Sequence, residues 1–227
     1  MKNKIILNNV TLACVSSIKI KESLLALEFS KLNIEYHEVL FLSSETIQVS
    51  NKINLVKIPK INNLIDYSKF ILLELFKHIK TDYVLLIQHD GFVLNADSWN
   101  PSYLDYDYIG APWPNKLIIQ GEYKMGLDLS KNLVGNGGFS IRSKKLLQET
   151  SKFNLDNINF PIIEDLLIGY YFFETLIKLG IKFPTAKLAA SFSIETEEAA
   201  YGHNLNNTFG FHGDELKKII YDSINYY

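Results

Sequence analysis

The sequence predicts a single α/β domain with a mostly parallel central sheet flanked by helices. Strand-like and helix-like segments alternate through the first 90 residues, which is typical of a parallel sheet with right-handed crossovers. Residues 83–87 are apolar without a break, as expected for a central strand covered on both faces. A chain of 227 residues with 47 % hydrophobic residues can bury one large core.

In the first part of the chain, a helix is indicated where Leu25, Phe29 and Leu32 recur at helical spacing. Pro59 is expected to end the strand before it. The elements predicted here, in chain order, are a strand at 10–15, a turn at Ser16 and Ser17, a helix at 20–32, strands at 36–42 and 54–58, a buried helix at 67–79 and a strand at 83–87.

The second part gives a less regular pattern, with a segment at 114–131 that is expected to be a loop. The other elements predicted here are a short strand within 106–113, a glycine turn at 135–138, a strand at 139–141, a helix from Ser143, a helix from Pro161 to Gly180, strand-like segments at 192–195 and 209–213, and a closing helix from Asp214.

Composition excludes several classes of protein. A formal net charge of −2 and a pI near 6.2 argue against a general nucleic-acid binder. Because Cys14 is the only cysteine, neither an intrachain disulfide nor a Cys-rich zinc site is expected. No apolar run reaches the roughly 18 residues that a membrane span needs, and Asn8 and Asn9 interrupt the apolar start too early for a signal peptide. We therefore expect a cytoplasmic protein.

Polar residues follow the most buried predicted strand. In parallel sheets ligands collect beyond the carboxyl ends of the strands, where Gln88, His89 and Asp90 should lie beside Ser16 and Ser17. Asp90 has three interpretations: a metal ligand, a catalytic group, or a loop cap bonded to backbone amides. His89 points opposite to its neighbours, so it either packs beneath the sheet end or contacts a nucleotide.

Four other features could carry chemistry, and each also has a purely structural interpretation. His212 is either a turn histidine or a metal or phosphate ligand. Glu164 and Asp165 either favour a helix N-terminus through the backbone dipole or supply a general base. The glycines at 135–138 form a tight turn, cradle a phosphate or let a ligand approach bare peptide. Trp113 is a sugar-stacking platform or a core anchor.

In order and spacing, several segments resemble a family of uncharacterised proteins grouped with GT-A-type glycosyltransferases. The segments that carry this resemblance are Tyr67-Ser68-Lys69-Phe70, Gln88-His89-Asp90-Gly91, 106–113, 135–142, Glu164-Asp165 and 209–213. The resemblance implies a GT-A-like (Rossmann-like) fold, with a nucleotide-sugar half at about 1–95 and an acceptor half at about 96–227. GT-A enzymes carry Asp-x-Asp at the strand end, whereas this chain has Gln88-His89-Asp90, which matches only the second aspartate.

The resemblance also implies roles for individual residues. It assigns Asp90 and His212 as ligands of Mn²⁺ or Mg²⁺, so these two residues must converge although they are far apart in sequence. It implies an acidic general base as in inverting enzymes, with a retaining outcome left open. Asp165 is preferred over Glu164 for this role because only one of two neighbours on a helix can face the cleft. Trp113 would lie on the acceptor side. The residues implied in nucleotide-sugar binding are Ser16, Ser17, Tyr67, Ser68, Lys69, Gln88, His89, Asp90, Asn136, Gly137 and Gly138.

The leading hypothesis is therefore a metal-assisted, hexosyltransferase-like enzyme. It would move a sugar from a nucleotide-diphosphate sugar to a glycan or glycolipid, as in polysaccharide biosynthesis from the cytoplasmic side, with peripheral membrane association left open. The first alternative is a nucleotide- or glycan-binding protein without catalysis. The second, a sugar nucleotidyltransferase, ranks lower because Ser16-Ser17-Ile18-Lys19 lacks the glycine-rich basic loop of those enzymes.

Overall fold

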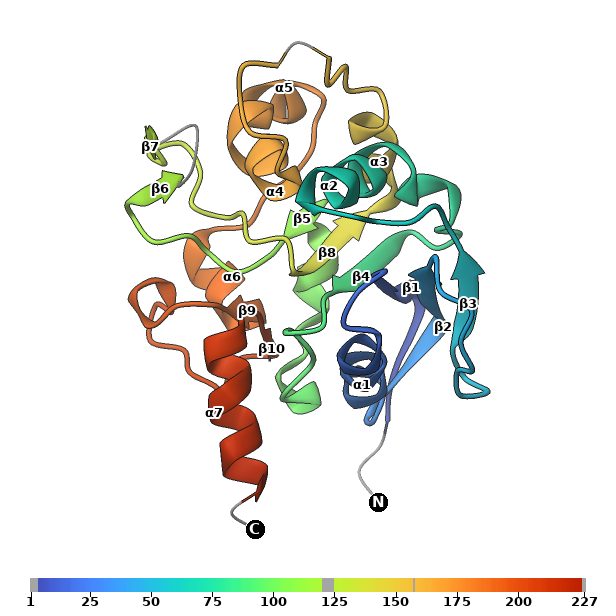
Figure 1. Cartoon of the computed structure of the whole chain (residues 1–227). Helices are drawn as coiled ribbons and strands as arrows, with labels where there is room; N and C mark the ends of the chain where they lie inside the picture. Colours follow the sequence, from blue (N-terminus) through green and yellow to red (C-terminus); the bar gives the residue numbers. More distant parts are fainter. Residues whose placement is uncertain (1–3, 120–124, 157, 226–227) are drawn as a thin grey trace.

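The computed structural model describes residues 4–119, 125–156 and 158–225, and within them a central sheet of six strands organises the fold (Figure 1). The strand order is β3-β2-β1-β4-β8-β5. β1 pairs in parallel with β2 and β4, and β2 with β3, whereas β8 runs antiparallel to β4 and β5. The predicted mostly parallel α/β sheet is confirmed. The strands are β1 (Ile5–Val15), β2 (Ile34–Ser43), β3 (Asn54–Lys57), β4 (Tyr83–Ile87), β5 (Tyr108–Ile109) and β8 (Phe139–Ser143).

Helices cover both faces of this sheet. α1 (Ile20–Ser30) packs on one face, where Leu12 and Cys14 of β1 share a core with Leu27. α2 (Leu64–Leu73) and α3 (Lys144–Thr150) cover the other face, where Ala13 and Val15 of β1 point (Figure 1). This alternation of successive side chains between two covered faces explains why the central strands are apolar without a break.

The second part of the chain adds short elements beside the sheet. They are β6 (Leu117–Ile119), β7 (Met125–Leu127), α4 (Glu164–Leu166), a π-helical turn (Leu167–Tyr171), α5 (Phe173–Lys178), α6 (Ala186–Phe192), β9 (Ser193–Ile194), β10 (Gly210–Phe211), α7 (Asp214–Asn225) and single 3₁₀ turns at Leu75–Lys77, Ala96–Ser98, Pro101–Asp105 and Glu197–Ala199. Gly210 of β10 bridges Val93, and the Leu94 N–H donates to the Phe209 carbonyl at 2.9 Å. The C-terminal segment is thereby joined to the chain that leaves β4.

The first helix is slightly shorter than predicted, and small residues make up much of its buried face. The helix ends at Ser30, and Leu25 and Leu32 are 42 % and 65 % exposed. Ser23 and Ala26 are buried instead. The reason is that the small side chains lie toward the sheet and satisfy backbone groups: the Ser23 hydroxyl donates to the Lys19 carbonyl, and the Ser30 hydroxyl accepts from the Val93 N–H. The helix is therefore confirmed, and of the three residues whose spacing indicated it only Phe29 packs against the core.

Three other predictions need correction. The strand predicted at 10–15 begins at Ile5, because a register shift after Leu7 lets β1 continue through two polar residues. The segment expected as a loop at 114–131 contains the antiparallel pair β6–β7, although 120–124 lie outside the described residues. The helix predicted from Pro161 to Gly180 begins at Glu164 and passes through the π-helical turn before α5, and α6 was not predicted.

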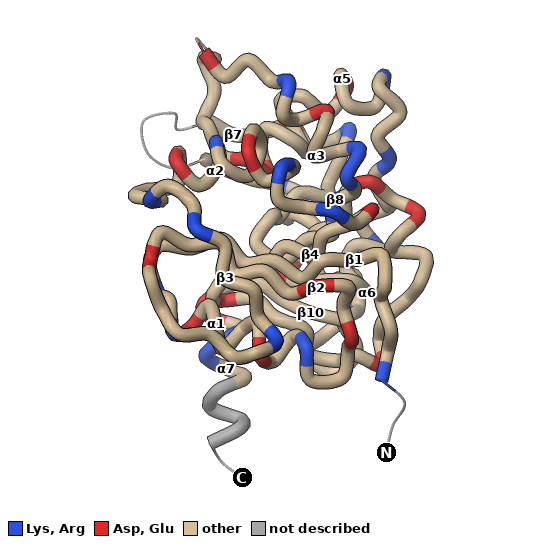
Figure 2. Tube along the Cα trace, turned by 90° about the vertical axis from the view of Figure 1, so that its right-hand side faces the viewer, with Lys and Arg blue, Asp and Glu red and all other residues tan. Residues whose placement is uncertain are grey.

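Lys and Arg positions and Asp and Glu positions both occur along the chain in the view of Figure 2, and several Lys and Arg stretches lie near α3 and β8. Among the described residues, none of the helices has the length and apolar character needed to cross a membrane.

Candidate functional site

A cavity of about 230 Å³ opens at the carboxyl ends of β1 and β4. Of the residues predicted to bind the nucleotide, five line it: Ser16, Ser17, Tyr67, Gln88 and His89. The Ser17 hydroxyl accepts from the Ile61 N–H at 3.0 Å and from the Ser44 hydroxyl at 2.9 Å, which fixes the wall of the cavity.

Ser68 and Lys69 do not line this cavity. Ser68 is buried, and its hydroxyl accepts from the Glu164 N–H at 3.2 Å, so it holds the start of α4. Lys69 is exposed on the next position of α2. The reason is helical geometry: Tyr67, Ser68 and Lys69 are consecutive, so they point in three directions and only one of them faces the cavity.

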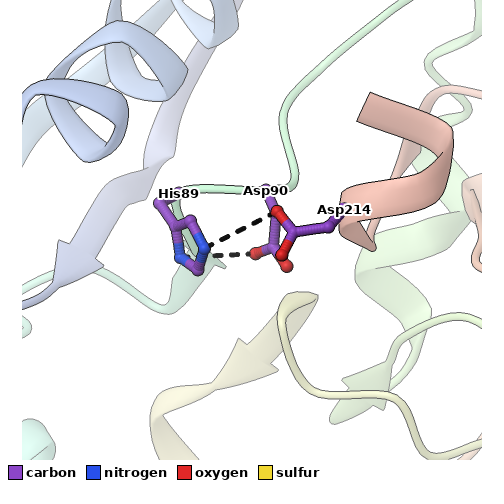
Figure 3. Close-up of side chains that lie close together, drawn as sticks. All are labelled: His89, Asp90 and Asp214. Carbon is purple, nitrogen blue, oxygen red and sulfur yellow. Dashed lines mark ion pairs between the residues drawn. The ribbon is translucent and has the colours of Figure 1, made fainter. Parts of the chain in front are cut away.

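His89, Asp90 and Asp214 form a compact group beside the cavity (Figure 3). One ligand atom from each lies within 4.8 Å of the others. His89 Nδ1 is 3.5 Å from Asp90 Oδ1, and His89 Nε2 is 3.9 Å from Asp214 Oδ1. Two carboxylates and an imidazole are ligand types that a divalent cation accepts.

Asp90 is the buried member of this group, at 9 % exposure. Its Oδ1 atom is buried and accepts no hydrogen bond from any described residue. Burial opposes ionisation, but the polar contact and charge of His212 outweigh it and lower the pKa of Asp90 to about 2. Oδ1 also lies 3.5 Å from His89 Nδ1 and from His212 Nε2, beyond normal hydrogen-bond length, so this ionised, buried carboxylate oxygen can accept a closer ligand such as a cation.

His212 lies between two carboxylates. Its Nε2 is 3.5 Å from Asp90 Oδ1 and 3.3 Å from Gln88 Oε1, and its Nδ1 is 3.2 Å from Glu195 Oε1. The convergence of Asp90 and His212 that the sequence required is confirmed. Burial opposes protonation, but the contacts with Asp90 and Glu195 raise the pKa of His212 to about 10. With oxygen atoms facing both nitrogens, the ring is an imidazolium that donates on each side.

The glycine turn packs against these groups. A Cβ on Gly138 would lie 2.0 Å from His212 Nε2, and a Cβ on Gly137 would lie 2.2 Å from Glu164 Oε1. Of the interpretations left open for the glycines, close approach to neighbouring groups is the one that this geometry supports. The turn thus connects His212 with the acidic residues at the start of α4.

Glu164 and Asp165 occupy different environments. Glu164 is 3 % exposed, and its Oε2 accepts from Arg142 Nη2 at 2.8 Å, an ion pair in which Arg142 is fully buried. Burial raises the pKa of Glu164 to about 7 against the pull of Arg142. Asp165 is half-buried and accepts from the Gly137 N–H at 3.2 Å and from the Leu166 N–H at 2.7 Å. Burial raises the pKa of Asp165, which suits a group that has to take up a proton.

Trp113 is enclosed by protein at 2 % exposure. Its ring fills the space that a Cβ on Gly135 or Gly169 would occupy, and its indole N–H donates to Asn136 Oδ1 at 3.1 Å. A ring this deeply buried offers no face for stacking a sugar, so the core-anchor interpretation describes it better. Through Asn136 it still orients a residue predicted to bind the donor sugar.

A family model matches residues 34–212, and its description is "Protein of unknown function (DUF5672)". The chain belongs to this family. No curated protein matches it. Among solved structures, this DUF5672 chain is similar to the crystal structure of a glycosyltransferase involved in the glycosylation of the major capsid of PBCV-1. The match covers 94 % of this chain and 98 % of that chain, with a TM-score of 0.52 and 14 % sequence identity. At this identity the match shows a shared fold and not a shared activity.

The charged residues of the site in this DUF5672 protein that were not predicted from sequence are Lys19, Arg142, Glu195, Asp214 and Lys217. Glu195 follows β9, and β9 pairs in parallel with β10, which precedes His212. Glu195 and His212 each follow one of two adjacent parallel strands, which is the signal that could have indicated Glu195. The two strands have only two residues each, so the sequence does not indicate them clearly. Asp214 was placed at a helix start, where an acidic residue has an ordinary explanation in the helix dipole.

The raised pKa of His212 gives a prediction for the variant His212→Gln. Because the folded protein keeps a proton that the unfolded chain releases above pH 6.5, the stabilisation by His212 is fully present below pH 6.5 and is lost as the pH approaches 10. The stability advantage of the wild type over His212→Gln should therefore fall with rising pH in this window, by at most about 1.4 kcal/mol per pH unit. Urea unfolding with a chelator present measures it. Parallel stability curves for the two proteins would contradict the prediction.

The buried pair gives a second prediction. Arg142→Met leaves the Glu164 carboxylate buried without its counter-charge and should cost about 3–5 kcal/mol of unfolding free energy. The double variant Arg142→Met/Glu164→Gln should recover part of this loss, because it removes both charges. Lys131→Met, which breaks the exposed pair Lys131–Glu174, is the control and should change stability little. Equal losses in the single and double Arg142 variants would show that the charge of Glu164 is not the cause.

Proposed function

We propose that the protein is a glycosyltransferase that uses a nucleotide-diphosphate sugar as donor and a glycan or glycolipid as acceptor. One observation carries this proposal: the cavity at the ends of β1 and β4, the buried Asp90 and the half-buried Asp165 belong to one continuous site. His212 and the turn at Gly137 and Gly138 link the two acids. The fold shared with a glycosyltransferase agrees with it.

The cavity is the proposed nucleoside site. About 230 Å³ is less than the 300 Å³ or more of pockets that enclose a whole ligand, so it suits the nucleoside portion of a larger donor. Tyr67 and the two serines would contact the nucleoside, and the diphosphate would then reach His89 and Asp90 at the rim. In this arrangement residues 1–95 bind mainly the donor, and 96–227 supply the acceptor side and Asn136.

Two observations support a divalent cation here: Asp90 Oδ1 is buried without a hydrogen-bond donor among the described residues, and the imidazole of His89 is adjacent to it. We propose Mn²⁺ or Mg²⁺, which would offset charge on the leaving diphosphate. His212 was predicted as a ligand as well. Since both of its nitrogens face oxygen atoms, we propose instead that its imidazolium stabilises negative charge directly.

Asp165 is the proposed general base. The acceptor hydroxyl has to lose a proton as its oxygen attacks the anomeric carbon, and a carboxylate opposite the leaving group gives inversion. Glu164 is held by Arg142, whereas Asp165 meets only backbone N–H groups through the contacts described above. The hydrogen bond from Gly137 orients the Asp165 carboxylate relative to the donor-sugar turn.

A thermal-shift screen of nucleotide-diphosphate sugars with and without Mn²⁺ tests donor binding. A donor present at about 100 times its Kd should stabilise the protein by about 2.7 kcal/mol, or roughly 5–10 °C in Tm for a chain of this size. Asp90→Asn should abolish the Mn²⁺-dependent part of the shift. The exposed Asp105→Asn is the matched control and should keep it. If no nucleotide sugar shifts the Tm under either condition, the proposed function is wrong.

With a donor and an acceptor identified, Asp165→Asn should lower kcat by about 10²–10⁴-fold, the range for loss of a general base. The KM for the donor should change little, because the base acts on the acceptor. The same substitution at the exposed Asp156 is the control and should leave kcat unchanged. Donor binding without turnover in the wild type, across acceptors and in donor hydrolysis, would favour a non-catalytic binding protein instead.

A further inference from the structure

Asp214 brings a carboxylate to the cation site from a distant part of the chain. It is the first residue of α7 and follows Gly213, whose positive φ of 116° turns the chain away from His212. The Gly213 N–H donates to the Asp90 carbonyl at 3.0 Å, which ties this turn to the end of β4. In Figure 3 the carboxylates of Asp90 and Asp214 lie side by side next to the His89 ring.

In this structure a lysine ammonium group lies beside the Asp214 carboxylate. Lys19 Nζ is 3.6 Å from Asp214 Oδ2 and 2.7 Å from His89 Nε2. The backbone of Lys19 is left-handed, with a φ of 47°, which is uncommon for a residue other than glycine. A strained residue persists where its surroundings hold it in place, and such residues gather at functional sites. The Lys19 ammonium group therefore lies between Asp214 of α7 and His89 at the end of β4.

The site contains a buried acidic oxygen that has no hydrogen-bond donor among the described residues. Asp90 Oδ1 accepts no hydrogen bond within the described part of the chain, and Lys19 contacts Asp214 and His89. The chain also has Gln88 where Asp-x-Asp would supply its first carboxylate, and the Gln88 amide oxygen faces His212. Asp214 is the additional carboxylate that the structure places within reach of Asp90.

We propose that Asp214 is the second carboxylate ligand of the divalent cation, and that the cation displaces the Lys19 ammonium when it binds. The ion would then link the N-terminus of α7 to the end of β4, so that ion binding orders α7. Lys217, one turn further along α7, already donates to the His89 carbonyl at 2.8 Å. The bound ion would keep this hydrogen bond in place by fixing α7 against the end of β4. This inference rests on the cation of the proposed function and deepens it.

The test uses the full chain with Mn²⁺ alone, without nucleotide. Mn²⁺ binding is measured by electron paramagnetic resonance of the free ion, and amide exchange of residues 214–220 by hydrogen–deuterium exchange. Asp214→Asn should weaken Mn²⁺ binding at least about tenfold, since even groups outside the first ligand shell have effects of this size. Glu215→Gln makes the same charge change one residue further on and should bind Mn²⁺ as the wild type does.

Lys19→Met is the second variant, and it acts in the opposite direction. Removal of the competing ammonium should tighten Mn²⁺ binding roughly two- to fivefold, which corresponds to the strength of an exposed ion pair. Mn²⁺ should slow amide exchange over 214–220 in the wild type and in Glu215→Gln, and leave it unchanged in Asp214→Asn. Circular dichroism checks that every variant is folded.

Several results would overturn the proposal. They are wild-type Mn²⁺ affinity in Asp214→Asn, unchanged or weaker binding in Lys19→Met, and the absence of Mn²⁺ binding in the wild type. If Asp90→Asn loses Mn²⁺ while Asp214→Asn keeps it, α7 is outside the ion site and the glycosyltransferase proposal stands. If the Mn²⁺ results are as expected but no nucleotide sugar binds, the proposed function fails and the ion-dependent docking of α7 stands.

Discussion

The ionic contact of His212 with Asp90 and Glu195 is the interaction on which the site depends. The three charged groups are mostly buried, and each would be costly without the others. Together they attach the segment after β10 to the end of β4, with the His212 N–H donating to the Ile194 carbonyl. Backbone contacts of Gly210 and Gly213 join the same segments, and the His212 contact adds the charged groups that link the end of β4 to the glycine turn.

The second constraint is the absence of side chains at Gly137 and Gly138. Both positions leave space that His212 and Glu164 occupy, so the sheet, α4 and the C-terminal segment can approach one another closely. The buried pair Arg142–Glu164 lies beneath the turn, and Arg142 Nη2 also donates to the Gly137 carbonyl at 3.3 Å. A buried ion pair contributes little net stability compared with apolar packing. We interpret this one as fixing the position of Gly137, and through its N–H the orientation of Asp165.

The sequence predicted the sheet well and the site in part, for reasons that particular residues make clear. β4 was predicted to its exact bounds because a strand buried on both faces is apolar at every position. Asp90 was predicted as a site residue because it follows β4 and because ligands bind at the carboxyl ends of parallel strands. The helix α1 was predicted, but its buried face could not be, because Ser23 and Ala26 pack there by being small, which hydrophobic periodicity does not register. Asp214 could not be recognised, since its role comes from contacts with His89 and Asp90, more than 100 positions away in the sequence. Glu195 contacts His212, which is only 17 positions away, but the two-residue strands that bring the pair together are too short for the sequence to indicate.

The charge balance of the site explains why a cation belongs with the proposed donor. Among the described residues, the acidic groups of the site are Asp90, Glu164, Asp165, Glu195 and Asp214, and the cationic ones are Lys19, Arg142, His212 and Lys217. Arg142 is committed to Glu164, and His212 is shared between two carboxylates. The positive groups of the site are therefore already paired with its own acidic residues. A bound diphosphate would add its negative charge to that of these acids. Besides the His212 imidazolium, a bound cation would offset this charge, and its proposed place is beside Asp90 Oδ1, which has no hydrogen-bond donor among the described residues.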